Sequence, residues 1–127
     1  MAKPKVASDW LAGCAGCHMS FLDIDERIVA LTELVDLRAT PITDLKEPDE
    51  SGVDVGILEG GISNTYNEEV ARKMRARCKI LVALGDCAVF GGVPAMRNFE
   101  GAEAALKRAY IETESTDESG KIPDDPE

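Results

Sequence analysis

Three cysteines in this sequence have the types of neighbours and the spacing that a metal centre needs. Cys14 and Cys17 form a Cys-x-x-Cys pair in a glycine-containing loop, and Cys87 lies in a second such loop, Gly85-Asp86-Cys87-Ala88. Two thiolates at this spacing can bind one centre, and the same spacing occurs in redox dithiols, zinc sites and iron–sulfur sites. A third cysteine at the same place in the fold favours a metal over a dithiol.

The elements that must position these cysteines alternate between strands and helices. A stripe of apolar residues at steps of three to four, from Phe21 to Val35, predicts a helix, and Ser20 with Asp23 predicts a capping box at its start. The run at 79–84 is continuously apolar, as expected of a strand covered on both faces. The alternation predicts an α/β fold, a parallel sheet with helices on both faces. The expected strands are 6–11, 35–40, 53–58 and 79–84, and the further expected helices are 64–77 and 102–111.

In an open parallel sheet, ligands bind beyond the carboxyl ends of the strands. Cys14 and Cys17 follow the first predicted strand, Glu59 follows the third, and Cys87 follows the fourth. We therefore expect all four at one edge of the sheet. Cys78 precedes the fourth strand, which puts roughly 20 Å between it and the far end of that strand. It cannot share their centre, and we interpret it as an inert buried thiol.

Two other side chains at this edge have open interpretations. Glu59 ends an apolar run before Gly60, and its carboxylate can carry protons, hydrogen-bond a partner subunit, or stand in water. His18, the only histidine, is expected to cap or pack rather than to ligate, because it directly follows Cys17. The sequence Cys14-Ala15-Gly16-Cys17-His18 also matches the haem-attachment pattern, but the α/β pattern is wrong for a small helical cytochrome. A thioredoxin-like dithiol leaves Cys87 unused, and a structural zinc site remains an alternative.

Composition excludes several classes of function. The 127 residues suffice for one domain, and 44% hydrophobic content is enough for a core. A formal charge of −10 argues against nucleic acid as a partner and against a polybasic membrane anchor. No apolar run reaches the ~20 residues of a membrane span, and the first residues do not resemble an export signal, so we expect a cytoplasmic protein. We expect a folded domain at 1–112 and an acidic tail or linker at 113–127.

The same motifs carry a family resemblance that spans about residues 5–123. The chain resembles the small subunits of cytoplasmic, bidirectional, NAD-linked nickel–iron hydrogenases, which are related to the 20 kDa subunit of respiratory complex I. That complex I subunit has adjacent cysteines where this chain has Cys14-x-x-Cys17. The different spacing argues against the chain being the complex I subunit itself. The matching segments are residues 10–23 (WLAGCAGCHMSFLD), 57–62 (ILEGGI), 85–88 (GDCA) and 93–99 (VPAMRNF).

The resemblance implies a flavodoxin-like domain that relays electrons as part of an oxidoreductase, active only within a complex. It implies one [4Fe–4S] cluster with Cys14, Cys17 and Cys87 as three ligands, beside the nickel–iron site of a large subunit. It further implies onward transfer to diaphorase subunits with flavin and iron–sulfur clusters. Glu59 would lie near the subunit interface and serve proton transfer. The flavodoxin-like fold also raises FMN binding, but no Ser/Thr-rich phosphate loop follows the first strand.

One departure from the family concerns the fourth cluster ligand. The family supplies a further cysteine from a proline-rich motif near its C-terminus, and this chain lacks that motif before Glu127. We therefore expect a C-terminally truncated version with an incomplete sheet, which would hold a four-iron cluster poorly. The alternatives to an NAD-linked hydrogenase small subunit are another cytoplasmic hydrogenase small subunit or a complex I-like oxidoreductase with a different electron acceptor.

Overall fold

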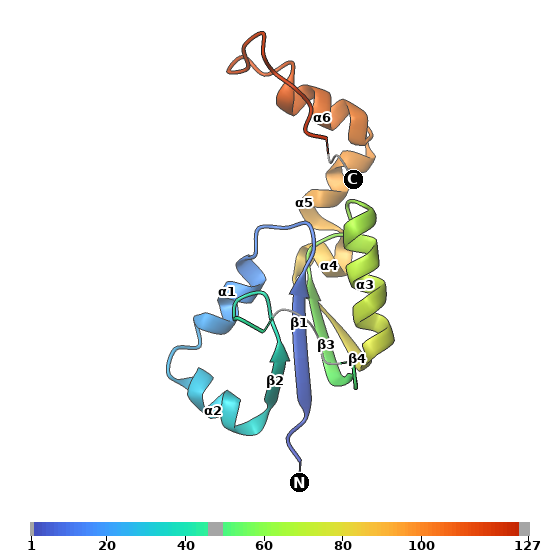
Figure 1. Cartoon of the computed structure of the whole chain (residues 1–127). Coiled ribbons are helices and arrows are strands. Elements are labelled where there is room, and N and C mark those ends of the chain that lie inside the picture. The colour runs from blue at the N-terminus through green and yellow to red at the C-terminus, as the bar shows by residue number, and fades with distance from the viewer. Residues whose placement is uncertain (1, 46–49, 125–127) are drawn as a thin grey trace. The chain divides into compact units, whose positions relative to one another are not determined.

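The computed structural model describes residues 2–45 and 50–124 (Figure 1). The chain divides into two compact units, Met1–Pro94 and Ala95–Glu127, and the predicted tail at 113–127 belongs to the second of them. The elements in chain order are β1 (Lys5–Trp10), α1 (Gly16–Leu22), α2 (Arg27–Leu34), β2 (Asp36–Ala39), β3 (Val53–Glu59), α3 (Thr65–Arg77), β4 (Cys78–Leu84), α4 (Asp86–Phe90), α5 (Gly92–Ala95), the 3₁₀ helix η1 (Met96–Asn98) and α6 (Ala102–Tyr110).

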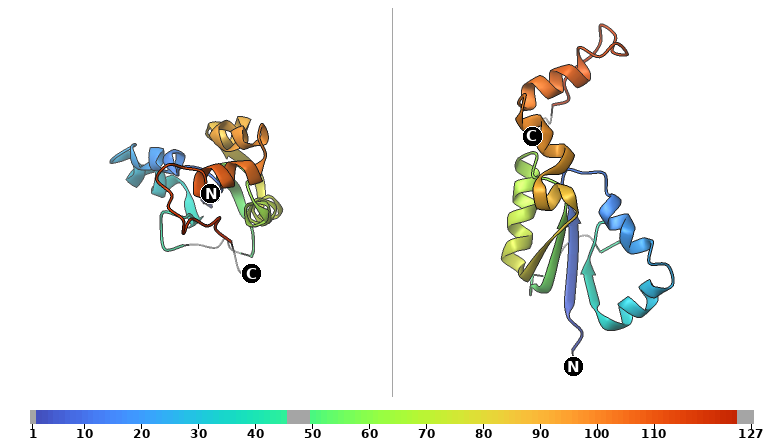
Figure 2. Two further views of the ribbon diagram at one scale, coloured as in Figure 1. Left: turned by 90° about the horizontal axis from the view of Figure 1, so that it is seen from above. Right: turned by 180° about the vertical axis from the view of Figure 1, so that it is seen from behind.

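The four strands form one parallel sheet in the order β2-β1-β3-β4. This confirms the predicted α/β class, and the order equals the first four strands of the flavodoxin-like order. Figure 2 shows α3 on one face of the sheet and α1 with α2 on the other. The predicted strands agree with the observed ones to within one or two residues, because their β-branched and apolar runs are bounded by loop residues.

A small apolar core fixes the sheet against α3. Met74 of α3 and Cys78 at the start of β4 lie in it, and Gly56 of β3 lets them approach closely. A Cβ at Gly56 would stand 2.8 Å from Met74 Sδ and 2.9 Å from Cys78 Sγ, so a larger residue does not fit there. Among the described residues, the fully or nearly fully buried hydrophobic ones are Ala7, Ala39, Val53, Leu58, Met74 and Cys78.

Helix α3 forms where its sequence predicts it. The Asn64 side chain accepts a hydrogen bond from the Asn67 backbone N–H (2.8 Å), which caps the helix. Ion pairs one turn apart, Arg72 with Glu68 and Lys73 with Glu69, support its exposed face.

The single helix predicted after the cysteines is wrong. The chain instead forms α1 and α2, separated at residues 23–26, where Asp25 has a left-handed φ of 53°. Such a conformation interrupts a helix, and Asp tolerates it better than most residues do. The predicted capping box is also wrong: Ser20 lies inside α1, and its hydroxyl donates to the Cys17 carbonyl (2.5 Å). The apolar stripe is therefore shared between two short helices.

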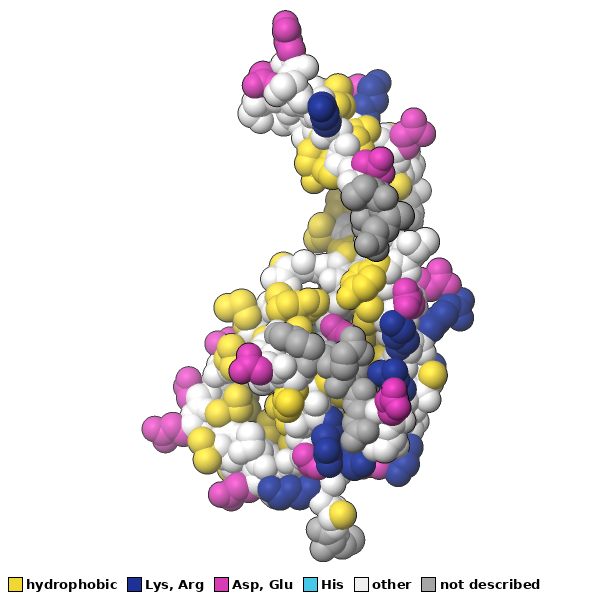
Figure 3. Space-filling view, in the orientation of Figure 1, with side chains coloured by type: hydrophobic (Ala, Val, Ile, Leu, Met, Phe, Trp, Pro, Cys, Tyr) yellow, Lys and Arg dark blue, Asp and Glu magenta, His cyan; other side chains and the backbone are white. Residues whose placement is uncertain are grey.

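The prediction that the fourth strand is covered on both faces is also wrong. β4 is the last strand in the sheet order, and Ile80 keeps 59% of its surface exposed. An apolar run alone does not distinguish a central strand from an edge strand, because both contain β-branched residues. Further hydrophobic side chains reach the surface on α1 and α2, and Figure 3 shows such atoms exposed in this part of the molecule; they include Met19, Leu22, Val29 and Leu34.

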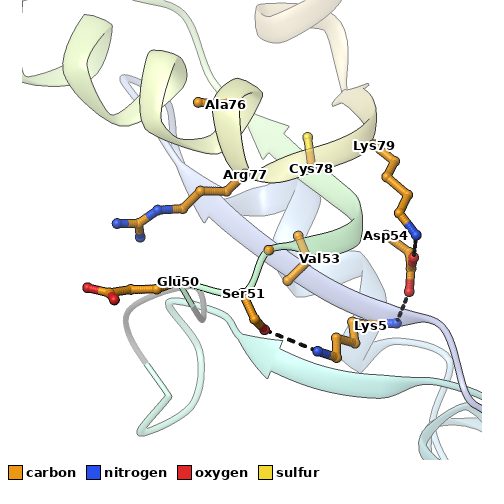
Figure 4. Close-up of a pocket in the computed structure, with 10 residues that line it drawn as sticks. Lys5, Glu50, Ser51, Val53, Asp54, Ala76, Arg77, Cys78 and Lys79 are labelled. Atoms are coloured by element: carbon orange, nitrogen blue, oxygen red, sulfur yellow. Dashed lines mark hydrogen bonds and ion pairs between the residues drawn. The ribbon is translucent and has the colours of Figure 1, made fainter.

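The amino end of the sheet carries an ion pair between Lys79 and Asp54, together with hydrogen bonds from Lys5. Asp54 accepts hydrogen bonds from Lys79 Nζ (2.6 Å) and from the Lys5 backbone N–H (2.8 Å), and Lys5 Nζ donates to Ser51 Oγ (3.2 Å) (Figure 4). These bonds, that of Lys79 first, hold the pKa of Asp54 below its ordinary value. The residues that make these bonds line a pocket of about 440 Å³.

No helix in the part of the chain that the structure describes has the length and apolar character needed to cross a membrane.

Candidate functional site

The candidate site lies at the carboxyl edge of the sheet, at the opposite end from the Lys79–Asp54 ion pair. Cys14 and Cys17 follow β1, Glu59 is the last residue of β3, and Cys87 lies in the first turn of α4, just after β4. β3 pairs with both β1 and β4, so these three strand ends are neighbours. Cys14 is exposed, whereas Cys17 and Cys87 are half-buried. The predicted site residues therefore share one edge, as the parallel order requires.

A glycine lets the first cysteine loop approach the last one. Gly85, between β4 and Cys87, has a φ of 85°, and a Cβ there would overlap Cys17 Sγ. On the other side of Cys87, Gly92 has a φ of 49°, and a Cβ there would stand 3.1 Å from Cys87 Sγ. Both positions therefore need glycine for conformation and for space. Cys17 and the turn that carries Cys87 lie directly against each other.

The electrostatics of the site also reflect this proximity. Burial raises the pKa of the Cys17 thiol, and the negative charges of Glu59, Cys14 and Cys87 raise it further, in that order. Three thiols and a carboxylate thus interact at the sheet edge, and a bound cationic centre would offset their mutual repulsion. Among residues 2–45 and 50–124, no three His, Cys, Asp or Glu side chains form a group able to hold a single metal ion. The donor set itself, three thiols, suits a thiophilic metal.

Glu59 is buried, with 2% of its surface exposed, so its interpretation as a solvated loop carboxylate is wrong. Its Oε2 accepts a hydrogen bond from the backbone N–H of His18 (2.5 Å) and also contacts His18 Nδ1. Its Oε1 lies on the side of Gly13, the residue before Cys14: a Cβ at Gly13 would stand 4.0 Å from it. The carboxylate is thus attached to the loop that carries Cys14 and Cys17.

His18 is completely buried and is a packing residue, as the sequence indicated, but it is also the partner of Glu59. Its Nε2 lies 2.9 Å from Ser8 Oγ of β1. The rings of Trp10 and Phe21 meet the imidazole edge-on, with centroids 5.7 and 6.2 Å away. Sequence reasoning missed the link to Glu59, because 41 residues separate the two and no spacing rule connects them.

Cys78 lies where the sequence placed it, at the amino end of β4. It is 7% exposed and belongs to the apolar core together with Met74. Figure 4 shows its sulfur pointing toward α3. The interpretation of Cys78 as a buried core thiol is confirmed.

The fold and the site together define a class, the flavodoxin-like α/β domains that bring cysteines to the carboxyl edge of a parallel sheet. Comparison with known families identifies the member of that class. The family described as NADH ubiquinone oxidoreductase, 20 Kd subunit, matches residues 14–123, and the chain belongs to this family.

Individual relatives are hydrogenase subunits. The chain is 46% identical over 109 residues to the NAD-reducing hydrogenase HoxS subunit delta of Cupriavidus necator, covering 86% of this chain and 52% of that one. It is 39% identical over 123 residues to a subunit of the F420-non-reducing hydrogenase of Methanothermobacter thermautotrophicus, covering 95% and 40%. The chain thus spans about half the length of these relatives, or less.

A solved structure has the same fold. The crystal structure of an NAD⁺-reducing [NiFe]-hydrogenase in the H₂-reduced state contains a chain that superimposes with a TM-score of 0.88 at 42% identity, covering 98% of this chain and 69% of that one. At this level of identity and coverage, the fold of nearly the whole chain is that of a chain in that enzyme.

Proposed function

We propose that this chain is the electron-relay small subunit of an NAD-linked [NiFe] hydrogenase. The observation that carries the proposal is the arrangement of Cys14, Cys17 and Cys87 at neighbouring strand ends. The 46% identity to a subunit of an NAD-reducing hydrogenase supports the particular enzyme. The chain would act as part of an oxidoreductase and perform no bond-making chemistry alone.

Within this proposal the three cysteines hold a [4Fe–4S] cluster. A four-iron cluster takes one thiolate at each iron, so its ligands surround it rather than meet at a single ion. This is consistent with a sheet edge that offers thiols from separate turns but no group arranged for one metal ion in the described residues. When bound, the cluster supplies a one-electron couple. With these three cysteines as ligands, the fourth iron of the cluster would need a ligand other than them.

The residues around the thiols have their own tasks in the proposal. Gly85 keeps the turn of Cys87 against Cys17. Glu59 would move a proton at Oε1, because Oε2 is already occupied by His18. The carboxylate lies beside the cysteine loop and can exchange that proton without leaving its place.

The partners follow from the same assignment. We propose a large subunit that carries the nickel–iron site and diaphorase subunits that carry flavin and iron–sulfur clusters, in the cytoplasm. The related crystal structure is that of an NAD⁺-reducing [NiFe]-hydrogenase, which supports both a nickel–iron site and NAD⁺ as the acceptor in such a complex.

An anaerobic reconstitution tests the cluster directly. The full chain, supplied with iron and sulfide, is expected to bind both and to develop the broad visible absorption of an iron–sulfur centre. Stoichiometric zinc without iron in anaerobically purified protein would contradict the proposal. Co-purification with neighbouring gene products, followed by an assay of hydrogen-dependent NAD⁺ reduction, tests the complex.

A second candidate differs only in the electron acceptor. Similarity to the F420-non-reducing hydrogenase extends over 123 residues, more than the 109 matched in the NAD-reducing enzyme. If the purified complex oxidises hydrogen with an artificial dye but not with NAD⁺, this second candidate is favoured.

A further inference from the structure

We infer that His18 is a positioning residue for the cysteine site: its ring and backbone fix Glu59 and thereby hold Cys17 against the turn of Cys87. The inference rests on the proposed function, since it assigns His18 a role in holding the same cluster. Both ring nitrogens of His18 contact protein groups, in a buried polar network that links three elements, α1, β3 and β1.

The first part of this network joins α1 to β3. Both the backbone N–H and the ring Nδ1 of His18 approach the same oxygen of Glu59, Oε2. The peptide nitrogen of His18 belongs to the Cys17–His18 peptide group, so the carboxylate fixes the backbone that carries the Cys17 thiol. Cys17 Sγ in turn lies directly against Gly85. A shift of Glu59 would therefore be transmitted to the distance between Cys17 and Cys87.

The second part fixes the ring itself. Nε2 contacts Ser8 Oγ on β1, and the rings of Trp10 and Phe21 meet the imidazole edge-on. With Glu59 ionised, Nδ1 must be the nitrogen that donates to it, and in the neutral ring the Ser8 hydroxyl then donates to Nε2. The ring is thus held at both nitrogens and by two aromatic neighbours, and it has little freedom to turn away from Glu59.

Burial makes the ring–carboxylate contact consequential. Glu59 is almost inaccessible to water, so without the His18 ring its carboxylate loses a donor that solvent cannot replace. A buried carboxylate that loses this donor moves toward another one. Such a movement acts next to Cys17, because Glu59 also accepts the hydrogen bond from the N–H of the Cys17–His18 peptide group. Outer partners that orient metal-binding groups typically affect metal affinity by about 10- to 100-fold.

Three substitutions of His18 distinguish the contribution of ring Nδ1, which contacts Glu59, from that of Nε2, which contacts Ser8. In His18→Asn, the side-chain amide can reach the place of Nδ1 and donate to Glu59. In His18→Gln, the amide reaches the place of Nε2 and can contact Ser8 but not Glu59 in the same way. His18→Leu keeps the volume roughly similar and removes both contacts. The comparison of Asn with Gln therefore isolates the bond to Glu59 from general damage to the core.

The experiment measures how fast iron leaves the reconstituted full chain when a strong iron chelator is added under anaerobic conditions. We expect His18→Asn to release iron at nearly the wild-type rate, and His18→Gln and His18→Leu to release it about tenfold faster or more. The electron paramagnetic resonance spectrum of the reduced centre supplies a second readout. It should match wild type in His18→Asn and differ in His18→Gln, because the surroundings of Cys17 change only in the latter.

Cys78→Ser serves as the matched control for lost stability. It places a hydroxyl in the apolar core beside Met74, away from the network, so it should lower the melting temperature of the apoprotein without changing iron release. Melting curves of the apoproteins show whether each His18 variant folds. If His18→Leu does not fold, the Asn and Gln variants still decide the question.

The possible results are distinguishable. Slow release from His18→Asn with fast release from His18→Gln supports the positioning role. Equal rates in these two variants, whether both slow or both fast, overturn it while leaving the proposed function intact, provided that the wild-type chain holds iron. Failure of the wild-type chain to bind iron and sulfide overturns the proposed function and this inference with it.

Discussion

The two ends of the parallel sheet contain the same kinds of residue but use them differently. At the amino end, the Cys78 thiol is part of the apolar core and the Asp54 carboxylate forms an ion pair with Lys79. At the carboxyl end, the Cys87 thiol lies at the edge of the sheet and the Glu59 carboxylate is buried against a histidine. Residue type alone therefore does not make a site; the end of the strand at which a residue stands does.

The cysteines of β4 and the turn after it provide the largest contrast. We expect Cys87→Ser to reduce the iron content of the reconstituted chain to near background, because it removes one of the proposed ligands, and Cys14→Ser and Cys17→Ser to behave alike. Cys78→Ser should leave iron unchanged and lower only the melting temperature. Iron and sulfide analysis of the four variants checks this. Equal loss of iron from Cys78→Ser and Cys87→Ser would erase the distinction between the two ends.

The two carboxylates of β3 provide the next contrast. In the proposed hydrogenase complex, Glu59→Gln should reduce hydrogen turnover by about 10²- to 10⁴-fold, the usual contribution of a positioned proton-transfer group, which is the role proposed for Glu59, while the iron content stays the same. Asp54→Asn changes a carboxylate on the same strand at the opposite end and should leave turnover unaffected. Hydrogen-uptake assays of the two complexes measure this. Unchanged turnover in Glu59→Gln would remove the proton-transfer role.

Two glycines, Gly85 at the cysteine site and Gly56 in the core, extend the comparison of the two regions to positions where an added methyl group has no space. Gly85 has a positive φ and no space for a Cβ beside Cys17, so Gly85→Ala should displace that thiol and accelerate iron release. Gly56→Ala would press on Met74 and Cys78 in the core, and overpacking of this kind costs about 1–3 kcal/mol of stability. Its iron release should remain that of wild type. Chelator-driven iron release and apoprotein melting separate the two effects, and a reversed pattern would contradict the geometry described.

The smallest expected effect is the acid sensitivity of the interactions of Asp54 at the amino end. The pKa of Asp54 is lowered in the folded protein by Lys79 first and by Lys5 second, so the charge of Asp54 stabilises the fold above the unfolded-state pKa, about 3.9. That contribution disappears as the pH falls through the lower, folded value. The melting temperatures of wild type and Asp54→Asn should therefore differ slightly at pH 7 and converge below pH ~4. A difference that grows on acidification would contradict the assignment.

Much of this architecture could be predicted from the sequence, because strand and helix periodicity is local. The runs before Cys14, Glu59 and Cys87 identify strands whose carboxyl ends must meet, and that rule alone gathers the candidate site. The break at Asp25 could not be predicted, since a single residue in a left-handed conformation leaves the apolar stripe on both sides intact. The exposure of Ile80 depends on what lies beside β4, which the strand itself does not encode.

The buried partner of Glu59 marks the limit of sequence reasoning at the site. His18 is visible next to Cys17, and Glu59 is visible at a strand end, but only the fold brings the ring nitrogen to the carboxylate. A lone histidine followed by an apolar residue has the same pattern as any packing residue. The contact depends on the pairing of β1 with β3 and on the early start of α1 at Gly16, whereas the predicted capping box puts that start later.

The central claim is that thiols from the turns after β1 and β4 bind one centre at the carboxyl edge of the sheet. Alkylation of the thiols before and after anaerobic cluster assembly, mapped by mass spectrometry, tests it most directly. The account predicts that Cys14, Cys17 and Cys87 react in the apoprotein and are protected after assembly, whereas Cys78 reacts in neither state. A Cys87 thiol that remains as reactive in the iron-loaded protein as in the apoprotein would contradict it.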